Sequence, residues 1–440
     1  MISPRRALAA LLAIAALTAT PAGADEGQWM PEQIADLDHD ALRRRGLELR
    51  PEELWDPAGG GLMRAAVNLS GCSASFISPE GLVITNHHCA YGALQAASTV
   101  ERDLLKDGFL ARTRAEEEPA RGRSVRVVEQ IDDVTEAIKA AAAAAPDDRA
   151  RARAVRAKIR ELVAACDAAG VARRCEVASF FGGSMYRQIA YLEIPDVRLV
   201  YAPPSSIGEF GGEIDNWMWP RHTGDFTILR AYVGPDGTPR AHDPDNLPYR
   251  PARWLRLAPE GVQPGDLVAV LGYPGRTPRY LWVAELTRTL DQTLPALIDL
   301  YGEWIAIAEE LGAADPAVAI KVAATKKSLA NRHKNSRGMI DGVKAMGLRE
   351  RREAEEARLR EGEGAALLAD LAEYSADARA RYPTAFALHR FAHAPSLVDA
   401  AVSLVRWARE RQRPERERAD GYLERDRDDL WNGIARRLRD

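Results

Sequence analysis

The chain has 440 residues, with 60 Lys and Arg against 64 Asp and Glu and a formal net charge of −4. Acidic and basic residues are interspersed, so the composition offers no basic face and argues against a nucleic-acid-binding protein. A chain of this length exceeds what one hydrophobic core ordinarily serves, so we expect two or three domains.

The first 24 residues have the three parts of a secretory signal peptide. Arg5 and Arg6 form a basic region, residues 7–17 an apolar stretch, and residues 22–24 a small-residue cleavage site. Such a stretch is too short to span a bilayer, and the alternative is a buried N-terminal helix. We predict a protein secreted across the inner membrane into the periplasm, with no membrane association after cleavage.

The part of the chain from about residue 65 to 280 predicts β-structure. Segments 71–77 and 82–86 flank a turn in which Pro79 and Gly81 occupy positions suited to type I, so we expect a hairpin. Further segments with strand composition are 124–130, 176–200, 226–233 and 266–271, the last predicted as a buried strand.

Helical sequence appears twice. Residues 133–168 are rich in Ala, Arg and Glu and are broken at Pro146, which predicts a helical excursion within the β-rich part. After residue 281 the spacing of apolar residues is helical throughout, in the segments 281–311, 316–346, 348–374 and 396–440. Strands followed by helices indicate separate units and not an alternating α/β sheet.

The chain has four cysteines, an even number, which in an exported protein indicates disulfides. Four cysteines allow three pairings. We choose Cys72 with Cys89 and Cys166 with Cys175 because each pair closes a short local loop. Free buried thiols are the alternative.

The apolar run 81–86 leads into His87, His88 and Cys89, with Cys72 ahead of it. A strand ending in Thr-x-x-His-Cys is similar to the way trypsin-like serine proteases present their catalytic histidine. Histidine suits a general base near neutral pH, and it needs a carboxylate to orient its ring. We choose His88 because it adjoins the cysteine, and His87 remains the competitor.

A metal site is the other interpretation of these residues. An exported metal protein would use His87, His88 and His222. Adjacent residues do not easily converge on one ion, and Cys89 is expected to be oxidised. We therefore predict no metal and no organic cofactor.

Residues 213–226 are dense in acidic, aromatic and histidine side chains. Asp225 immediately precedes the predicted strand 226–233, a position that suits a carboxylate held at a strand edge and directed at His88. The alternatives are that Asp225 only caps a turn after Gly224, or that Asp215 is the carboxylate.

Five segments carry a resemblance to a known family: 25–31, 81–89, 202–208, 215–226 and 272–277. They resemble the bacterial dipeptidyl-peptidases of the trypsin-like serine class (dipeptidyl-peptidase 7 and 11 type). These are exported exopeptidases that remove dipeptides from peptide N-termini. The resemblance covers the mature chain to about residue 345.

The resemblance implies roles for five residues. His88 matches the catalytic histidine and Asp225 the catalytic aspartate. Asn216, Trp217 and Asn331 match residues that hold the α-ammonium group of the substrate. Amide oxygens accept hydrogen bonds from an ammonium group, and an indole ring attracts it by a cation–π interaction. The alternatives are core packing for Trp217 and a solvated helix position for Asn331.

The resemblance also implies the fold, a mixed β then α architecture. It consists of a chymotrypsin-type double β-barrel, whose second barrel is incomplete in this chain, with an inserted α-helical domain. The expected organisation is a signal peptide (1–24), a β-barrel catalytic region (25–280) and a helical cap domain (281–440). Peptides with a free N-terminus are the expected partners, and a homodimer is possible.

The nucleophilic serine of this family lies in a Gly-x-Ser-Gly turn far downstream. None of Ser73, Ser75, Ser184 and Ser336 follows Asp225 in a strand–turn context. We therefore expect a serine dipeptidyl-peptidase whose serine and oxyanion hole are missing from this chain, which alone is inactive. The alternative is a non-catalytic peptide-binding protein or a decayed, truncated pseudoenzyme.

Overall fold

The computed structural model describes residues 29–56, 61–99, 101–275, 281–362, 364–393, 396–419 and 421–439. The predicted signal peptide lies outside these residues. The chain divides into two compact units. The first comprises the described part of Met1–Arg64 together with Ala258–Ala269, and the second comprises Ala65–Leu257 and Val270–Asp440.

The first unit contains short helices. Their bounds are η1 (Pro31–Asp36), α2 (His39–Arg44) and α3 (Pro51–Leu54). Proline at the first position starts η1 and α3, where its missing N–H costs nothing. Asp38 caps α2 by accepting a hydrogen bond from the backbone N–H of Ala41 at 2.9 Å.

The predicted strand at residues 266–271 was wrong, because the structure has no strand there. Val268 and Val270 are 67% and 98% exposed. Residues such as valine favour strands because their side chains pack well on a pleated surface. A segment that contains them forms a strand only where a neighbouring strand supplies backbone hydrogen bonds. None of the described strands pairs with this segment.

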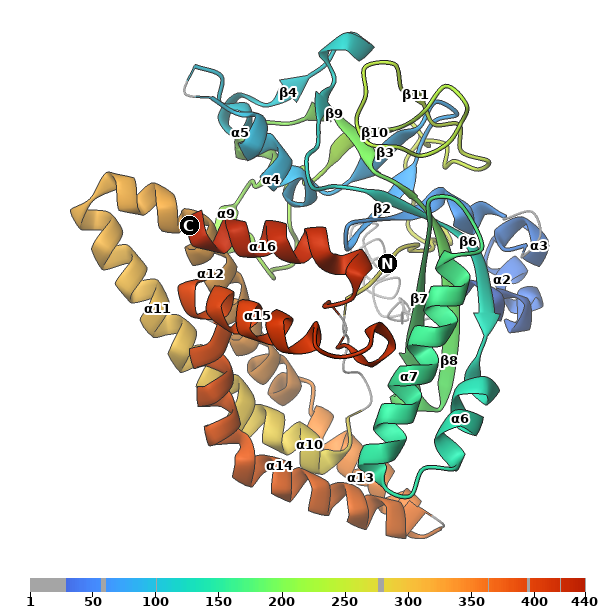
Figure 1. Ribbon diagram of the computed structural model, residues 1–440, viewed down its shortest axis with the longest axis vertical. Coiled ribbons are helices and arrows are strands. Elements are labelled where there is room, and N and C mark those ends of the chain that lie inside the picture. Colours follow the sequence, from blue (N-terminus) through green and yellow to red (C-terminus); the bar gives the residue numbers. More distant parts are fainter. Residues whose placement is uncertain are drawn as a thin grey trace, which may run out of the picture. The chain divides into compact units, whose positions relative to one another are not determined.

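The second unit contains an antiparallel sheet of 11 strands among the described residues. The strand order is β4-β9-β10-β3-β2-β1-β6-β8-β7, with β11 on β10 and β5 on β9 (Figure 1). The bounds are β1 (Ala66–Leu69), β2 (Cys72–Phe76), β3 (Leu82–Thr85), β4 (Phe109–Leu110), β5 (Glu118–Pro119), β6 (Val125–Asp133), β7 (Arg173–Phe180), β8 (Met185–Ile194), β9 (Asp196–Ala202), β10 (Thr227–Val233) and β11 (Leu247–Pro248).

The predicted hairpin is present, because β2 and β3 pair with Phe76 opposite Val83. Both side chains are fully buried and belong to the main apolar cluster of the sheet, which also contains Leu199 and Leu229. Burying such side chains is the main favourable contribution to folding. The core therefore lies against the same strands that lead to His88 and Asp225.

The helices of the second unit fall into three groups. Those near the sheet are α4 (His87–Ala97), α5 (Leu104–Asp107), η3 (Arg114–Glu116), η4 (Phe181–Gly183), α8 (Ser205–Gly208) and α9 (Gly212–Asp215). The excursion consists of α6 (Thr135–Ala143) and α7 (Asp148–Asp167). The later helices are α10 (Val283–Arg288), the π-turn Thr289–Thr293, α11 (Leu294–Ala314), α12 (Pro316–Ala345), α13 (Leu348–Arg360), α14 (Gly364–His393), α15 (Ser396–Glu410), η6 (Glu415–Glu417), η7 (Glu424–Asp426) and α16 (Arg427–Arg439).

The helical excursion is confirmed, with Pro146 in the gap between α6 and α7. Figure 1 shows both helices beside the β7–β8 hairpin. A disulfide from Cys166 on α7 to Cys175 on β7 joins the helix to the hairpin. Around it lies a small apolar cluster that includes Val163 and Ala190.

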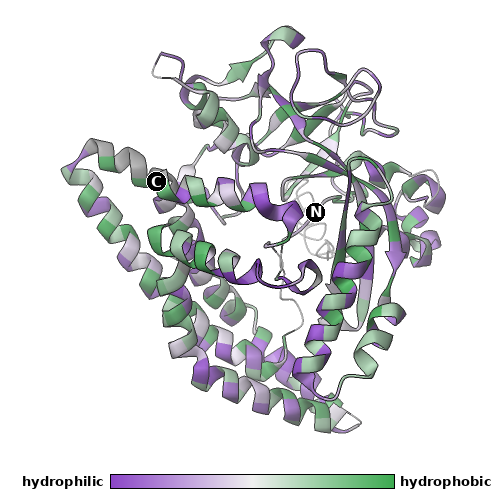
Figure 2. Cartoon of the chain, viewed as in Figure 1, coloured by the Kyte–Doolittle hydropathy of each residue, from purple (hydrophilic) through white to green (hydrophobic). Residues whose placement is uncertain are grey.

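The later helices pack through individual aromatic and polar contacts. Trp407 on α15 meets Trp431 on α16 edge to face at 5.0 Å between ring centroids. The indole N–H of Trp282 donates to the Ser375 hydroxyl at 2.8 Å. Figure 2 shows both hydrophilic and hydrophobic residues along these helices. Within the described part of the chain, no helix has both the length and the apolar character that crossing a bilayer requires.

Two hairpin glycines give a test of the sheet. Gly81 and Gly71 both have positive φ, +73° and +95°. A Cβ on Gly81 would lie 2.7 Å from the carbonyl oxygen of Tyr249 and 2.9 Å from that of Ala231, whereas a Cβ on Gly71 would meet nothing within 4 Å. We expect Gly71→Ala to lower the free energy of unfolding by roughly 1 kcal/mol, through backbone strain alone.

Gly81→Ala carries the same strain, and its Cβ also pushes the turn away from the backbone at Ala231 and Tyr249. We therefore expect the free energy of unfolding to fall by about 2 kcal/mol more than in Gly71→Ala. Urea unfolding followed by circular dichroism measures both variants. Equal losses in the two variants would contradict the close approach at Gly81.

Candidate active site

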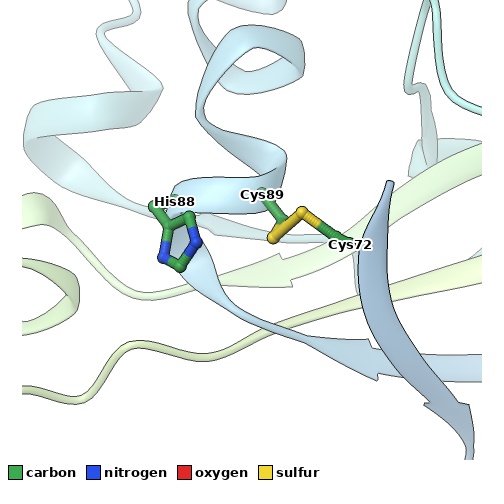
Figure 3. Close-up of side chains that lie close together, drawn as sticks. All are labelled: Cys72, His88 and Cys89. Atoms are coloured by element: carbon green, nitrogen blue, oxygen red, sulfur yellow. A yellow bond between two sulfur atoms is a disulfide. The ribbon is translucent and has the colours of Figure 1, made fainter. Parts of the chain in front are cut away.

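The first turn of α4 follows directly after β3 and carries His87, His88 and Cys89. A disulfide bonds Cys89 to Cys72 on β2 with an S–S distance of 2.06 Å. Figure 3 shows His88 beside this disulfide. The bond ties the turn that presents His88 to the sheet, and both disulfides of the structure join the pairs chosen from the sequence.

The sulfur atoms of Cys72 and Cys89 and a ring nitrogen of His88 lie within 4.8 Å of one another. Metal binding by cysteine requires the thiolate. Both sulfurs are committed to the disulfide, so this group offers only the imidazole as a ligand.

His88 and Asp225 are brought together by strand pairing. β10 lies antiparallel to β3 with Thr227 opposite Thr85. The residues just outside this pair are therefore neighbours as well. The Nδ1 atom of His88 lies 2.8 Å from the Oδ2 atom of Asp225, and the backbone N–H of His88 donates to Oδ1 at 3.1 Å. The carboxylate thus fixes both the ring and the main chain of His88.

Asn86 is a third member of this group, which the sequence analysis did not single out. Its side-chain NH₂ donates to the Oδ2 atom and to the backbone carbonyl of Asp225, both at 3.2 Å. Its place before the histidine pair was the available signal.

Partial burial alone would raise the pKa of Asp225. The hydrogen bonds that His88 donates to this carboxylate, together with the charge of His88, outweigh the burial and lower that pKa below its ordinary value.

The ring of His88 is open on its other side. Its side chain is 60% exposed, while that of Asp225 is 20% exposed. When Nδ1–H donates to the carboxylate, Nε2 carries the lone pair and can accept a proton. Within the described residues no hydrogen bond reaches Nε2. The pair therefore has the form of a general base with an orienting carboxylate.

None of the four serines considered from the sequence is bonded to His88 among the described contacts. Ser73 instead accepts a hydrogen bond from the N–H of Tyr273 at 2.7 Å. Ser184 lies in the turn between β7 and β8, and Ser336 is buried on α12. None of the described hydrogen bonds joins a serine hydroxyl to His88.

The competitor His87 has a different environment. Its ring is fully buried, and neither nitrogen has a hydrogen-bond partner among the described residues. The ring packs on Gly208, where a Cβ would lie only 2.5 Å from its Cγ. Burial lowers the pKa of His87, and the nearby carboxylates of Glu209 and Asp225 offset this only in part. A buried neutral imidazole does not reach a substrate, so His88 is the better base.

Asp215, the rival carboxylate, ends the short helix α9. Its side chain folds against the backbone of Gly211, and none of its described contacts reaches His88. The strand-edge position of Asp225 was therefore the informative sequence signal.

The three residues expected at the substrate N-terminus are also brought together. Asn331 on α12 accepts two hydrogen bonds at Oδ1, from the side-chain NH₂ of Asn216 at 2.9 Å and from the indole N–H of Trp217 at 3.0 Å. The indole N–H also lies 3.2 Å from the backbone oxygen of Asn331. Trp217 is exposed, which differs from the core-packing alternative, and Asn331 is bonded and not merely solvated.

The surroundings of Asn216 add two charged groups. A carboxylate oxygen of Glu213 accepts from the Asn216 NH₂ at 3.2 Å, and Arg221 lies 3.4 Å from the Asn216 Oδ1 atom. Trp217 has a left-handed backbone, with φ of 61°. Such a conformation costs energy in a bulky residue and persists only where neighbouring contacts hold it.

An exposed histidine oriented by a partly buried carboxylate is the arrangement that serine-type hydrolases use. The profile of the peptidase S46 family matches residues 24–440, and the chain belongs to this family.

Two relatives illustrate the match. The Asp/Glu-specific dipeptidyl-peptidase of Shewanella putrefaciens is 40% identical over 429 residues, which are 95% of this chain and 57% of that protein. Dipeptidyl-peptidase 7 of Capnocytophaga gingivalis is 37% identical over 323 residues, or 73% of this chain and 45% of that protein. The chain spans about half the length of the curated relatives it matches.

Solved structures agree with these relatives. Porphyromonas endodontalis DPP11 in complex with substrate matches with a TM-score of 0.75 and 28% identity over 94% of this chain and 60% of that one. The same protein in complex with the dipeptide Arg-Asp matches with a TM-score of 0.71 and 35% identity over 76% of this chain and 49% of that one. The mixed architecture with a large antiparallel sheet is thus shared with DPP11.

The burial of His87 predicts acid sensitivity. An unfolded histidine titrates near 6.5, and the folded pKa of His87 is lower. Below about pH 6.5 the unfolded chain therefore binds more protons, and stability falls as the pH falls. We expect His87→Phe, whose ring does not titrate, to lose less stability between pH 8 and pH 5 than the wild type, each compared with its own value at pH 8.

Urea unfolding at the two pH values measures the effect. His222→Phe is the control, since His222 is exposed. Asp225 titrates below this pH range and does not contribute to it. An unchanged pH dependence in His87→Phe would show that another group is responsible.

Proposed function

We propose that this chain carries the general base, its orienting carboxylate and the N-terminus-binding site of a periplasmic serine-type dipeptidyl-peptidase. The observation that carries the proposal is the 2.8 Å contact between the His88 ring and the Asp225 carboxylate beside an open Nε2. The names of the relatives, which are dipeptidyl-peptidases, support the reaction class. The architecture proposed with it is a chymotrypsin-type double β-barrel (25–280) and a helical cap domain (281–440).

In the proposed reaction, His88 takes the proton of a serine hydroxyl through Nε2. The serine oxygen then attacks the carbonyl of the second residue of the peptide. Asp225 holds the ring and stabilises the imidazolium, which next protonates the leaving amine. His88 then takes a proton from water, whose oxygen attacks the acyl-enzyme carbonyl. The bond to the serine oxygen breaks, His88 returns the proton to that oxygen, and the dipeptide is released. The serine belongs to a part of the enzyme that the described residues do not contain, and no metal or organic cofactor takes part.

An exopeptidase that releases dipeptides must recognise the first residue of its substrate. We assign this role to Asn216, Trp217 and Asn331. The Oδ1 atom of Asn331 already accepts two hydrogen bonds, which use both of its lone pairs. A peptide ammonium group therefore meets the Glu213 carboxylate, or it replaces an existing donor, which is Arg221 at the Asn216 Oδ1 atom or one of the two donors at Asn331. The Trp217 ring adds a cation–π surface.

Binding of short peptides tests this assignment. We expect the chain to bind a free tetrapeptide at least about tenfold more tightly than its N-acetylated form, because acetylation removes a charged hydrogen-bond donor. Asn216→Ala should abolish most of this preference. Isothermal titration calorimetry measures both affinities.

The matched control is Asn335→Ala, one turn further along α12, since none of the described hydrogen bonds of the site involves Asn335. Equal affinity of the wild-type chain for the free and acetylated peptides would refute the N-terminus-binding site.

A second expectation concerns turnover. A triad without its serine retains only residual rate enhancement, lower by roughly 10⁶-fold. We therefore expect a dipeptidyl chromogenic substrate to be hydrolysed by the chain no faster than by its His88→Ala variant. A higher wild-type rate that a fluorophosphonate blocks would show that a serine of this chain acts as the nucleophile.

The second candidate function is a non-catalytic peptide-binding protein. It is favoured by the contacts that join Asn216, Trp217 and Asn331, together with the absence of any serine hydroxyl bonded to His88 among the described residues. The reading frame that follows Asp440 separates the two candidates, because a Gly-x-Ser-Gly segment there supports the peptidase.

A further inference from the structure

Helix α12 presents three polar residues to the segment that carries Asn216 and Trp217. Lys327, Asn331 and Lys334 are spaced by four and three residues, so they lie on one face of the helix. Asn331 makes the hydrogen bonds described above. The two lysines stand about one helical turn before and after it, and both bind the chain just ahead of Asn216.

Lys327 joins three elements. Its ammonium group forms an ion pair with Glu209, which follows α8, and it lies 4.8 Å from the centroid of the Tyr91 ring on α4. The side chains of Lys327 and Glu209 are 43% and 26% exposed. An exposed ion pair is worth little by itself, but a cation that also faces an aromatic ring has a defined position. This contact ties α12 to the helix that begins at His87.

Lys334 binds the other end of the same segment. Its ammonium group donates to the backbone oxygens of Glu213 and Ile214, at 2.7 and 2.6 Å. Both carbonyls belong to the short helix α9, and the last carbonyls of a helix have no partner within it. Lys334 supplies that partner and fixes the residues that immediately precede Asn216.

The two lysines are poorly suited to bind a substrate directly. An uncompensated cation near the site would repel a peptide ammonium group. The positive charge of Lys327 is compensated by Glu209, and that of Lys334 is engaged by two carbonyl dipoles. Among the described residues, their polar contacts are with Tyr91, Glu209, Glu213 and Ile214. The role they fit is to hold the segment in place.

We propose that Lys327 and Lys334 are positioning residues of the peptide N-terminus site. Together they fix residues 209–214 on α12, so that Asn216 and the left-handed Trp217 meet Asn331. This inference rests on the proposed function for its effect on peptides, whereas the contact between Trp217 and Asn331 can be tested without any peptide.

The test uses Lys327→Met and Lys334→Met in the full chain, which keep an unbranched side chain of nearly the same length and remove its charge. Lys326→Met is the matched control. Lys326 is also 43% exposed and lies on the same helix, but its ion pair, at 3.6 Å, is with Glu309 on α11. Lys327→Arg is the conservative variant, since its guanidinium can still pair with Glu209.

Two readouts are taken. The first is the ratio of the Kd values for an N-acetylated and a free tetrapeptide. The second is the hydrogen-exchange rate of the Trp217 indole N–H, observed by ¹⁵N NMR and assigned with Trp217→Phe. We expect each Met variant to lower the Kd ratio about five-fold and to speed the indole exchange at least about five-fold. Lys326→Met and Lys327→Arg should stay within two-fold of the wild type.

If Lys327→Met does not fold, Glu209→Gln removes the same ion pair without changing α12. The inference would be overturned if both Met variants kept the Kd ratio and the Trp217 indole exchange rate of the wild type. A wild-type chain that does not prefer the free peptide would instead refute the proposed function. In that case, the indole exchange still decides whether the lysines hold Trp217 against Asn331.

Discussion

The pairing of β3 with β10 is the constraint on which the site depends. Antiparallel register places Thr85 opposite Thr227, and the two chains continue from that point to His88 and Asp225. A shift of the register by one residue would turn the alternating side chains to the opposite faces of the sheet. The apolar core under these strands therefore determines the geometry of the histidine–carboxylate pair, and the disulfide to β2 holds the turn that carries His88.

The sequence was most informative where the chemistry is local to a strand end. The apolar run before His88 and the strand after Asp225 led to the prediction that these two side chains meet, and the structure places them 2.8 Å apart. Strand ends are recognisable from composition and turn residues. The strand prediction was wrong at 266–271. The valines there favour a strand, but none of the described strands pairs with this segment. Likewise, the spacing of Lys327, Asn331 and Lys334 was visible in the sequence. Their partners lie more than a hundred residues away, and no local pattern identifies them.

The contacts of Asn331 bear on the proposed N-terminus site. Sequence reasoning assigned the amide oxygens of Asn216 and Asn331 as ammonium acceptors. In the structure, the Asn331 oxygen already holds Asn216 and Trp217, so its first role is to organise the other two. Satisfying every polar group before a ligand arrives avoids the cost of an unpaired buried donor or acceptor. A peptide must then offer hydrogen bonds at least as good as those it replaces.

Asn216 and Trp217, two of the three residues proposed to hold the start of a peptide, lie on the same short segment as Asp225, residues 216–225. In the proposed peptidase this segment acts as a molecular ruler, because its folded length sets how far from the first residue the chain is cut. Product size would then depend on the loop between Trp217 and Asp225, and relatives with a longer loop there would release longer fragments.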